Sequence, residues 1–361
     1  MKFKKLEISN FRNIENLEIF PSDGINVIYG QNAQGKTSIL EALWCFTGAK
    51  SFRGSKDTEM IRFGSEKSKI KLEFFDDERD QSCVIDIEKS RTAVLNDVPL
   101  GAASKIAGKI YSIVFSPNDL NIIKDGPSFR RKFLDTAIFQ LYPKFIDISK
   151  RYLRAVDQRN KILKEIKFNP NLSEFLEDFE SEIAELGSEI ICYREKFVEH
   201  LKKFVPLIYN GISGGKEHIE VIYATTASKD KEEFKALLKD SFNADIQTLS
   251  TSVGPHRDDI DIKINGISAR NFGSQGQKRS AALALKLAES EVISEITGKK
   301  PVALLDDVMS ELDPDRQNYI LNHICDWQVF ITCCDPSNIA GLEKGKIFEI
   351  ENGILKSSNV L

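Results

Sequence analysis

The segment at residues 30–37 restricts the fold of this chain more than any other. It reads G-Q-N-A-Q-G-K-T, follows an apolar run at residues 25–29, and precedes a helical pattern at residues 38–46. A strand, a glycine-rich loop and a helix in this order predict a phosphate-binding loop, because glycines let backbone N–H groups surround a phosphate at a helix N-terminus. Lys36 would reach the β- and γ-phosphates of a nucleotide, and the Thr37 hydroxyl would ligate Mg²⁺. The predicted nucleotide-binding residues are Gly30, Gln31, Asn32, Ala33, Gln34, Gly35, Lys36, Thr37 and Ser38.

A second apolar run, at residues 301–305, ends in two carboxylates, Asp306 and Asp307. A phosphate-binding loop needs a carboxylate near Mg²⁺, so we expect Asp306 to hold the metal together with Thr37, often through water. Asp307 would polarise the water that attacks the γ-phosphate. In the alternative interpretation, Asp307 only accepts a hydrogen bond from groups around the metal.

Two further motifs surround this second run. The sequence F-G-S-Q-G-Q-K-R at residues 272–279 precedes a long Ala/Leu helical pattern, and S-E-L-D at residues 310–313 follows the aspartates. The order resembles that of ATP-binding-cassette ATPases: Walker A, signature, Walker B and D-loop. In that class the signature binds the γ-phosphate of a nucleotide held by the other subunit, so the resemblance implies an ATP-dependent homodimer. The implied residues are Ser274, Gln275, Gly276 and Gln277 in the signature and Ser310 and Asp313 in the D-loop.

The signature segment also has a purely structural interpretation. Ser274 precedes the helical pattern and Gln277 follows three residues later, which is the spacing of a capping box. The two Walker motifs favour the nucleotide-binding interpretation over an ordinary helix start.

A change of hydrophobic period divides the chain. Short alternating strands precede residue 122, a helical period extends from Pro127 to about residue 204, and the Asn265-Gly266 pair between two strand patterns predicts a hairpin. We therefore predict an α/β protein: a cassette-type P-loop ATPase head with an inserted, mostly helical arm. The expected segments are residues 1–122 for the first part of the head, 123–250 for the arm and 251–361 for the second part of the head.

The charge pattern does not decide whether the chain has a surface that binds nucleic acid. The net charge is −4, but basic residues dominate between residues 124 and 167, and residues 174–189 are mostly acidic. Lys150, Arg151 and Arg154 lie on or beside one helical face and could follow DNA phosphates. The same face could instead pair with the acidic helix after it.

No apolar run of 18 residues and no signal-peptide pattern is present, so we expect a cytoplasmic protein without a membrane segment.

The sequence does not favour a transporter cassette. They usually carry a Gln before the helical subdomain and a His after Walker B, whereas this chain has F-S-P-N-D-L at residues 115–120 and I-T-C-C-D at residues 331–335. Structural-maintenance-of-chromosomes ATPases have a similar head layout but insert hundreds of heptad residues, and no sustained heptads occur here.

The full set of motifs resembles the RecF family of bacterial recombination and replication-repair ATPases. In family order, the matching segments beside the Walker, signature and D-loop motifs are N-F-R-N at residues 10–13, L-E-A at 40–42, S-F-R at 51–53, F-S-P-N-D-L at 115–120, the stretch from Pro127 through R-R-K-F-L-D at 130–135, and G-P-H-R-D-D at 254–259. The chain departs from the family at Lys278, which is often Gln, and at Cys333-Cys334, where Thr or Ser is common.

The resemblance implies a function on DNA. It implies a nucleoid-associated clamp with weak DNA-stimulated ATPase activity, which binds double-stranded DNA and single-strand/double-strand junctions as an ATP-bound dimer and works with RecR and RecO to load RecA. Related heads use a basic residue near the nucleotide at the position of Arg12, and a surface charge is an equal alternative for this residue. Arg53 and Arg62 are candidates for contact with DNA or the nucleotide, but solvated loop charges are the favoured interpretation. A further alternative is a DNA-binding module that ATP dimerises with negligible hydrolysis.

Overall fold

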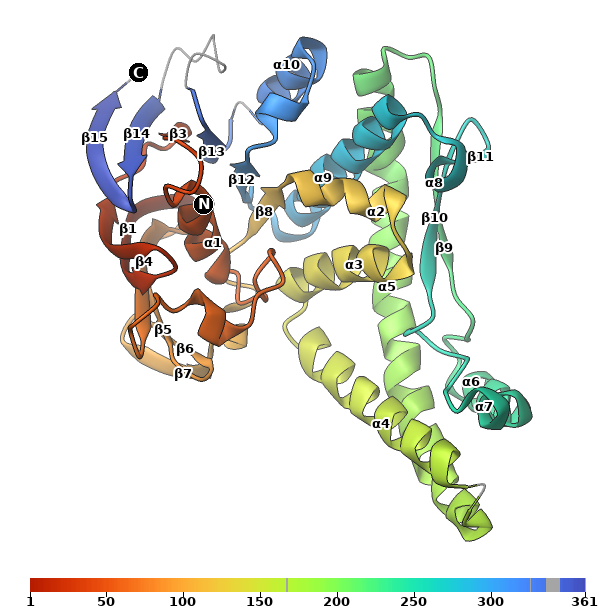
Figure 1. The fold of residues 1–361 in the computed structure, drawn as a ribbon. Helices are drawn as coiled ribbons and strands as arrows, with labels where there is room; N and C mark the ends of the chain where they lie inside the picture. The colour runs from red at the N-terminus through yellow and green to blue at the C-terminus, as the bar shows by residue number, and fades with distance from the viewer. Residues whose placement is uncertain (167, 325, 336–344, 361) are drawn as a thin grey trace.

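Three β-sheets and a set of long helices form the protein in a computed structural model, which describes residues 1–361 apart from 167, 325, 336–344 and 361 (Figure 1). The predicted α/β architecture is confirmed. In Figure 1 the two six-stranded sheets lie on one side together with both chain termini, the three-stranded sheet lies on the other side, and the helical arm extends away from the six-stranded sheets.

The sheet that carries the phosphate-binding loop has the order β15-β14-β3-β13-β12-β8. The strands from β14 to β8 run parallel, and β15 is antiparallel at the edge. Parallel strands are buried on both faces, which explains the continuous apolar runs seen in the sequence. Their bounds are β3 Ile25–Tyr29, β8 Ser112–Phe115, β12 Val302–Asp306, β13 Val329–Cys333, β14 Gly345–Glu351 and β15 Ile354–Val360.

A second, antiparallel sheet with the order β2-β1-β4-β5-β6-β7 faces the first across helix α1 (Lys36–Cys45). Almost every side chain of α1 is buried, because the helix contacts strands of both sheets. A helix covered on all sides keeps the loop before it in a fixed position. The strands are β1 Lys2–Phe11, β2 Ile14–Ile19, β4 Ser68–Phe75, β5 Asp80–Ile87, β6 Arg91–Leu95 and β7 Val98–Ala102.

The arm consists of α3 (Pro127–Leu141), α4 (Phe145–Glu165) and the long α5 (Leu176–Ser213), with α6 (Lys231–Asp240) and α7 (Phe242–Thr248) beside it. The helical period predicted up to about residue 204 corresponds on α5 to one apolar face, whose residues Ile183, Leu186, Ile190, Phe197 and Leu201 are all buried. Helix α5 extends from the tip of the arm to the side of helix α9 (Gln275–Thr297), so one helix connects the arm to the head (Figure 1).

The third sheet has the order β11-β10-β9 and contains the predicted hairpin. Asn265 and Gly266 both have positive φ, as the tight turn between β10 (Asp259–Ile264) and β11 (Ile267–Ser268) requires. Strand β10 also pairs with β9 (Ile219–Ala224). This pairing crosses the boundary that we predicted after residue 250, between the arm and the second part of the head. The division into three segments stays a prediction.

The remaining helical elements are short. They are the helices α2 Asn121–Lys124, α8 Ala269–Phe272 and α10 Pro314–His323, and the 3-10 turns η1 Asp57–Met60, η2 Ala103–Ile106, η3 Pro117–Leu120, η4 Pro170–Phe175 and η5 Met309–Glu311.

Candidate functional site

The phosphate-binding loop follows β3 and leads directly into α1, as the sequence predicts. Gly30, Ala33 and Gly35 have positive φ, a backbone conformation that favours glycine, so two of the three positions carry the residue best suited to them. At Gly30 a side chain would overlap the backbone carbonyl of Ile350 on β14. Glycine is therefore needed here so that the loop can pack closely against β14, as well as for its positive φ. The loop backbone is therefore fixed by its neighbours.

Lys36 lies inside the loop and is almost fully buried. Its Nζ donates to the carbonyl oxygens of Gly30 at 2.6 Å and Gln31 at 2.8 Å. Cys334 directly follows β13, and its Sγ atom lies 3.8 Å from the same Nζ and donates to Asn32 Oδ1 at 3.1 Å. The ammonium group is thus held in the loop, where a phosphate would be bound.

The two predicted metal ligands meet although they are 269 residues apart. Thr37 Oγ1 donates to Asp306 Oδ1 at 2.7 Å, and Thr332 Oγ1 donates to the same carboxylate oxygen at 3.1 Å. They meet because β3, β13 and β12 are adjacent parallel strands whose carboxyl ends lie at one edge of the sheet. A hydroxyl and a carboxylate in contact are oxygen ligands of the type that Mg²⁺ takes.

The electrostatics of this pair also suit a cation. Burial raises the pKa of Asp306, and the neighbouring Asp307 carboxylate raises it further, whereas the hydrogen bonds from Thr37 and Thr332 lower it. A divalent cation would favour the ionised form of Asp306 and offset the cost of burying its charge. The residues present therefore fit Mg²⁺.

Asp307 has a strained backbone directly after β12. Its φ is 55°, and its N–H donates to Thr332 Oγ1 at 2.9 Å. A left-handed conformation at a non-glycine residue costs free energy and is often found at functional sites. The D-loop residue Ser310 donates to the carbonyl oxygen of Asp307 at 2.9 Å, which connects the D-loop to the end of the strand.

The C-terminal hairpin supports the phosphate-binding loop, and the sequence analysis missed this. The backbone N–H of Asn352 donates to the side-chain Oε1 of Gln34, and the N–H of Gly353 donates to the Gln34 carbonyl at 2.9 Å. A side chain at Gly353 would overlap the carbonyl of Asn13. The only local signal was the Asn-Gly pair itself, which predicts a tight turn but not its location.

Arg12 and Arg53 both reach the buried carboxylate of Glu41 on α1. Arg12 Nε and Nη2 donate to the two Glu41 oxygens at 2.9 and 2.8 Å, and Arg53 Nη1 lies 3.6 Å from Oε2. Ser51 also donates to Glu41. Residues 10–13 and 51–53, which the sequence analysis singled out separately, thus form one cluster with L-E-A at residues 40–42.

The signature segment is a capped helix start exposed at the surface. Ser274 Oγ accepts from the Gln277 N–H at 3.1 Å, and the Gln277 Oε1 accepts from the Ser274 N–H at 2.7 Å, so the predicted capping box is confirmed. Ser274 and Gln275 are exposed. The cap uses an acceptor lone pair of the Ser274 hydroxyl and leaves its hydrogen available, so the structural interpretation does not exclude phosphate binding.

The signature and the D-loop of one chain are joined to each other. Arg316 on α10 donates through Nε to Ser280 Oγ on α9 at 3.0 Å and through Nη2 to the Gly276 carbonyl at 3.4 Å. Its Nη1 donates to Asp313, the N-cap of α10. In Figure 1 the start of α9 lies apart from β3 and α1, with β12 between them. One chain therefore does not bring its own signature to its own phosphate-binding loop.

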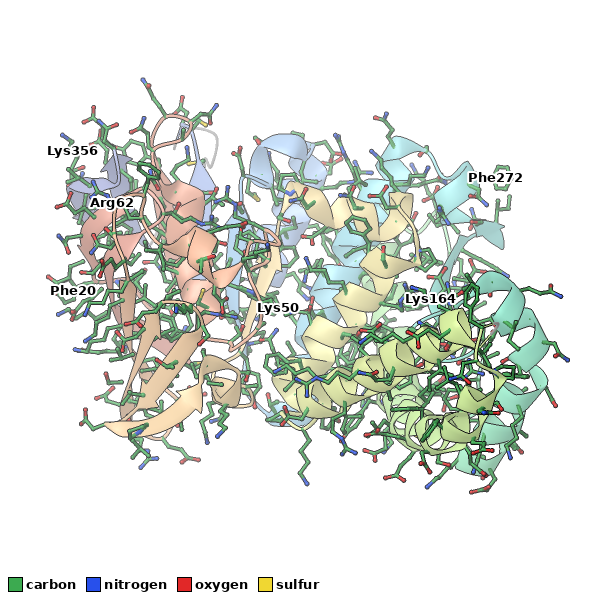
Figure 2. All side chains as sticks on the ribbon, turned by 60° about the horizontal axis from the view of Figure 1, so that its bottom comes forward. Phe20, Lys50, Arg62, Lys164, Phe272 and Lys356 are labelled. Carbon is green, nitrogen blue, oxygen red and sulfur yellow. The ribbon has the colours of Figure 1, made fainter. Side chains whose placement is uncertain are left out.

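The basic residues predicted to contact DNA lie on the outside of α4. Lys150, Arg151 and Arg154 are exposed, and Arg151 donates to Glu182 on α5 at 3.0 Å. Figure 2 shows Lys164, further along α4, far from Arg62 and Phe20 of the head. The ion pair of Arg151 agrees with the alternative of a helix face paired with the acidic segment. Among the described residues, Lys150 and Arg154 have no such pair.

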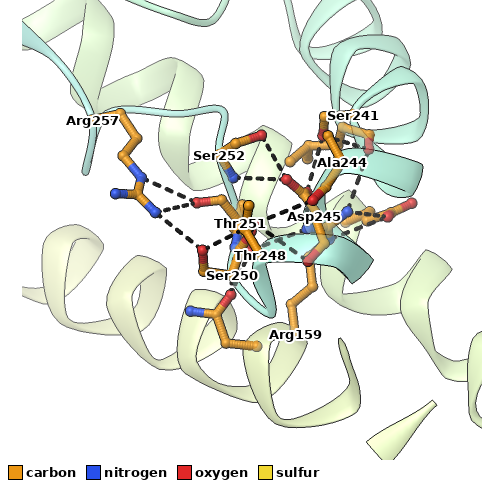
Figure 3. A network of polar contacts seen from close by, with 12 residues as sticks. Arg159, Ser241, Ala244, Asp245, Thr248, Ser250, Thr251, Ser252 and Arg257 are labelled. Carbon is orange, nitrogen blue, oxygen red and sulfur yellow. Dashed lines mark hydrogen bonds and ion pairs between the residues drawn. The ribbon is translucent and has the colours of Figure 1, made fainter. Parts of the chain in front are cut away.

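Two arginines from the same basic stretch are buried instead. Arg130 donates to Asp259 at 2.5 and 2.9 Å, and Arg159 is completely buried against Glu180 and Asp245. The network around Asp245 continues through Thr251 to Arg257, in the G-P-H-R-D-D segment (Figure 3). These arginines stabilise the arm and do not contribute to a surface.

Comparison with known proteins agrees with this geometry. The family model described as "RecF/RecN/SMC N terminal domain" matches residues 2–355. A protein of Lachnoclostridium phytofermentans named "DNA replication and repair protein RecF" is 39% identical over 360 residues, covering 99% of each chain. A protein of the same name from Agathobacter rectalis is 40% identical over 357 residues, covering 98% of each chain.

Solved structures agree with the sequence relatives. A structure entitled "Structure of the recombination mediator protein RecF-ATPrS in RecFOR pathway" superimposes with a TM-score of 0.92 at 38% identity, covering 99% of this chain and 98% of that one. The Smc head domain of Pyrococcus furiosus has the same fold, with a TM-score of 0.57 at 17% identity, covering 100% of this chain and 96% of that one. The expected cassette-type head is thus confirmed, and the chain belongs to the RecF family of DNA replication and repair proteins.

Proposed function

We propose that the chain binds ATP at residues 30–38 and closes into a dimer on it. The contact between Thr37 and Asp306 carries this proposal, because it joins the phosphate-binding loop to the carboxylate that such a loop requires. Lys36 and the backbone N–H groups at the start of α1 would bind the phosphates. Two solved relatives are named as RecF bound to ATP or ATPrS, which supports the same ligand here.

Mg²⁺ would be held by Thr37 and Asp306, directly or through water. When bound, it would supply the positive charge that stabilises the phosphate oxygens during transfer. Asp307 follows Asp306 and is the residue we assign to polarising the attacking water. A carboxylate on the shorter aspartate side chain would reach less far than glutamate, so we propose slow hydrolysis.

The signature would act on the nucleotide of the partner subunit. Ser274 is exposed at the start of α9, and Figure 1 shows this helix start apart from β3 and α1, which flank the phosphate-binding loop. Two chains arranged head to tail would place each Ser274 and Gly276 against the other chain's γ-phosphate. Because Arg316 joins the signature to the D-loop, Ser310 and Asp313 would approach the same nucleotide together.

The closed dimer would act on DNA in repair and replication. We propose that it binds double-stranded DNA and single-strand/double-strand junctions through exposed basic residues, with Lys150, Arg151, Arg154 and Arg53 as candidates. Cooperation with RecR and RecO in loading RecA, in the cytoplasm at the nucleoid, is proposed from family membership. Within the described part of the chain, no helix has the length and apolar character that crossing a membrane requires.

Sedimentation of the wild type and of Asp307→Asn tests the proposal, with and without ATP and gapped DNA. We expect ATP to produce dimers in both proteins, and Asp307→Asn to remain dimeric for longer because hydrolysis is lost. ATP hydrolysis is measured on the same samples. Wild-type dimers without measurable hydrolysis, even with DNA, would leave the alternative of a DNA-binding module that ATP dimerises. An absence of ATP-dependent dimers would contradict both.

A further inference from the structure

A carboxylate, Glu217, connects the signature turn to the end of helix α5. Glu217 lies in the short segment between α5 and β9. Its Oε1 accepts from Gln277 Nε2 at 2.7 Å, and its Oε2 accepts from the Tyr209 hydroxyl at 2.7 Å. Tyr209 belongs to the last turns of α5 and is completely buried. The carboxylate therefore links α5 to Gln277, which forms the capping box of the signature helix with Ser274.

The amide of Gln277 has no alternative orientation that preserves these bonds. Its Oε1 accepts from the Ser274 N–H, so its Nε2 must face Glu217. Rotating the amide by half a turn would place a donor against the Ser274 N–H and an acceptor against the Glu217 carboxylate. Glu217 thus fixes the Gln277 side chain, and Gln277 fixes the backbone that presents Ser274.

The position of Glu217 is itself fixed by its surroundings. The N–H of Gly215 donates to the Asn210 carbonyl at 2.9 Å, at the end of α5. On the other side, the His218 N–H donates to Asn265 Oδ1 and the Asn265 N–H donates to the His218 carbonyl, at 2.9 and 2.8 Å. The segment that carries Glu217 is therefore anchored to α5 and to the β10–β11 turn.

The same end of α5 supports the D-loop helix. A side chain at Gly211 would overlap the ring of Tyr319 on α10, so α10 packs closely against α5 at this point. Arg316, one helical turn before Tyr319, binds the Gly276 carbonyl. The last turns of α5 thus contact both elements that our proposed dimer presents to the partner's nucleotide.

We propose that Glu217 is a positioning residue of the composite ATP site, which holds the signature turn so that Ser274 meets the γ-phosphate of the partner subunit. This inference rests on the proposed ATP-dependent dimer. Glu217 would not contact the nucleotide. It would act through Gln277, and its effect would therefore appear only in the subunit that supplies the signature.

A mixture of two defective chains tests where Glu217 acts. A Lys36→Ala chain would supply a signature but hold no ATP, and a Ser274→Arg chain would hold ATP but supply no signature. When the two chains are mixed with ATP, they would form dimers with one complete site, in which the Ser274→Arg chain holds ATP and the Lys36→Ala chain supplies the signature. Sedimentation measures the fraction of these dimers. We then place Glu217→Ala in one chain or in the other.

We expect Glu217→Ala to weaken dimer formation about tenfold in the Lys36→Ala chain, where the signature is used, because a hydrogen bond to a charged acceptor is lost. In the Ser274→Arg chain it should have no effect. Glu217→Gln should restore part of the loss, and Tyr209→Phe should cause a smaller loss with the same dependence on placement. Glu220→Ala, at an exposed position of β9 three residues further on, is the matched control.

Two results would overturn the inference, and they are distinguishable from failure of the dimer itself. Equal losses in both placements, accompanied by a lowered melting temperature, would mean that Glu217 only stabilises the fold. Unchanged dimers in both placements would mean that the signature does not need it. If the starting mixture forms no dimer with ATP, the proposed composite site fails, and the inference fails with it.

Discussion

Replacing Arg159 by methionine should destabilise the arm strongly, because this arginine neutralises two buried carboxylates. Its guanidinium donates five hydrogen bonds (Figure 3). Nε and Nη2 donate to Glu180, Nη1 donates to Asp245 and Thr251, and Nη2 also donates to the Leu238 carbonyl. The side chains of Arg159 and Asp245 have no exposed area, and that of Glu180 is 6% exposed. Methionine would retain the packing of the side chain but none of these contacts.

The two carboxylates would not be affected equally. Asp245 would still accept from the Ser252 N–H and hydroxyl and from Ser241, at 3.0, 2.5 and 3.0 Å. Among the described residues, Glu180 has only Arg159 as a hydrogen-bond partner. Removing one side of a buried ion pair typically costs about 3–5 kcal/mol. We expect Arg159→Met to lower the free energy of unfolding by about this amount, with Glu180 responsible for most of the loss.

Two matched variants separate this cause from others. Arg154→Met changes an exposed arginine on the same helix and should alter stability by no more than about 0.5 kcal/mol. Arg159→Met with Glu180→Leu removes the unpaired carboxylate together with the arginine, and should recover a large part of the loss. Urea unfolding followed by circular dichroism measures all three.

Two results would refute the reasoning. One is equal stability of Arg159→Met and Arg154→Met. The other is a failure of Arg159→Met with Glu180→Leu to recover any of the loss, because the unpaired Glu180 carboxylate would then not be its cause.

Three further predictions concern the proposed function. Lys36→Ala should abolish ATP-dependent dimers without changing the fold, because it removes the charge that binds the β- and γ-phosphates; equal dimer fractions in sedimentation would contradict the site. Ser274→Arg should retain ATP affinity in the monomer yet prevent dimers, as nucleotide titration and sedimentation would measure; dimers in this variant would exclude a signature that acts on the partner. Reversing Lys150, Arg151 and Arg154 to Glu should weaken duplex binding and flatten the slope of log affinity against log salt by up to roughly one unit per lost phosphate contact. An unchanged slope with lower thermal stability would favour pairing with the acidic segment instead.

The nucleotide site could be predicted from the sequence because its parts carry local signals. The loop at residues 30–37 lies between a strand and a helix, and its glycines meet backbone requirements that no other residue satisfies as well. Asp306 was identifiable because it ends a buried strand. Its contact with Thr37 then follows from the alignment of parallel strands at one edge of a sheet.

Other contacts carried no local signal. Arg130 and Arg159 lie in the basic stretch between residues 124 and 167, and nothing near them in the sequence indicates that they are buried against the distant carboxylates Asp259 and Asp245. The spacing of Ser274 and Gln277 predicted the capping box, but nothing near Gln277 indicated Glu217, 60 residues earlier. Long-range pairs of this kind depend on tertiary packing, which a hydrophobic period does not encode.

The contact between the C-terminal hairpin and the phosphate-binding loop has a consequence for synthesis of the chain. Gln34 obtains its two backbone partners from Asn352 and Gly353, and Gly30 packs against Ile350. Because domains can begin to fold while the ribosome is still adding residues, the N-terminal sheet can form long before these partners exist. We expect a ribosome-bound chain ending before β14 to gain no protection from protease when ATP is added, so that nucleotide binding, and with it dimer closure, begins only after translation is nearly finished.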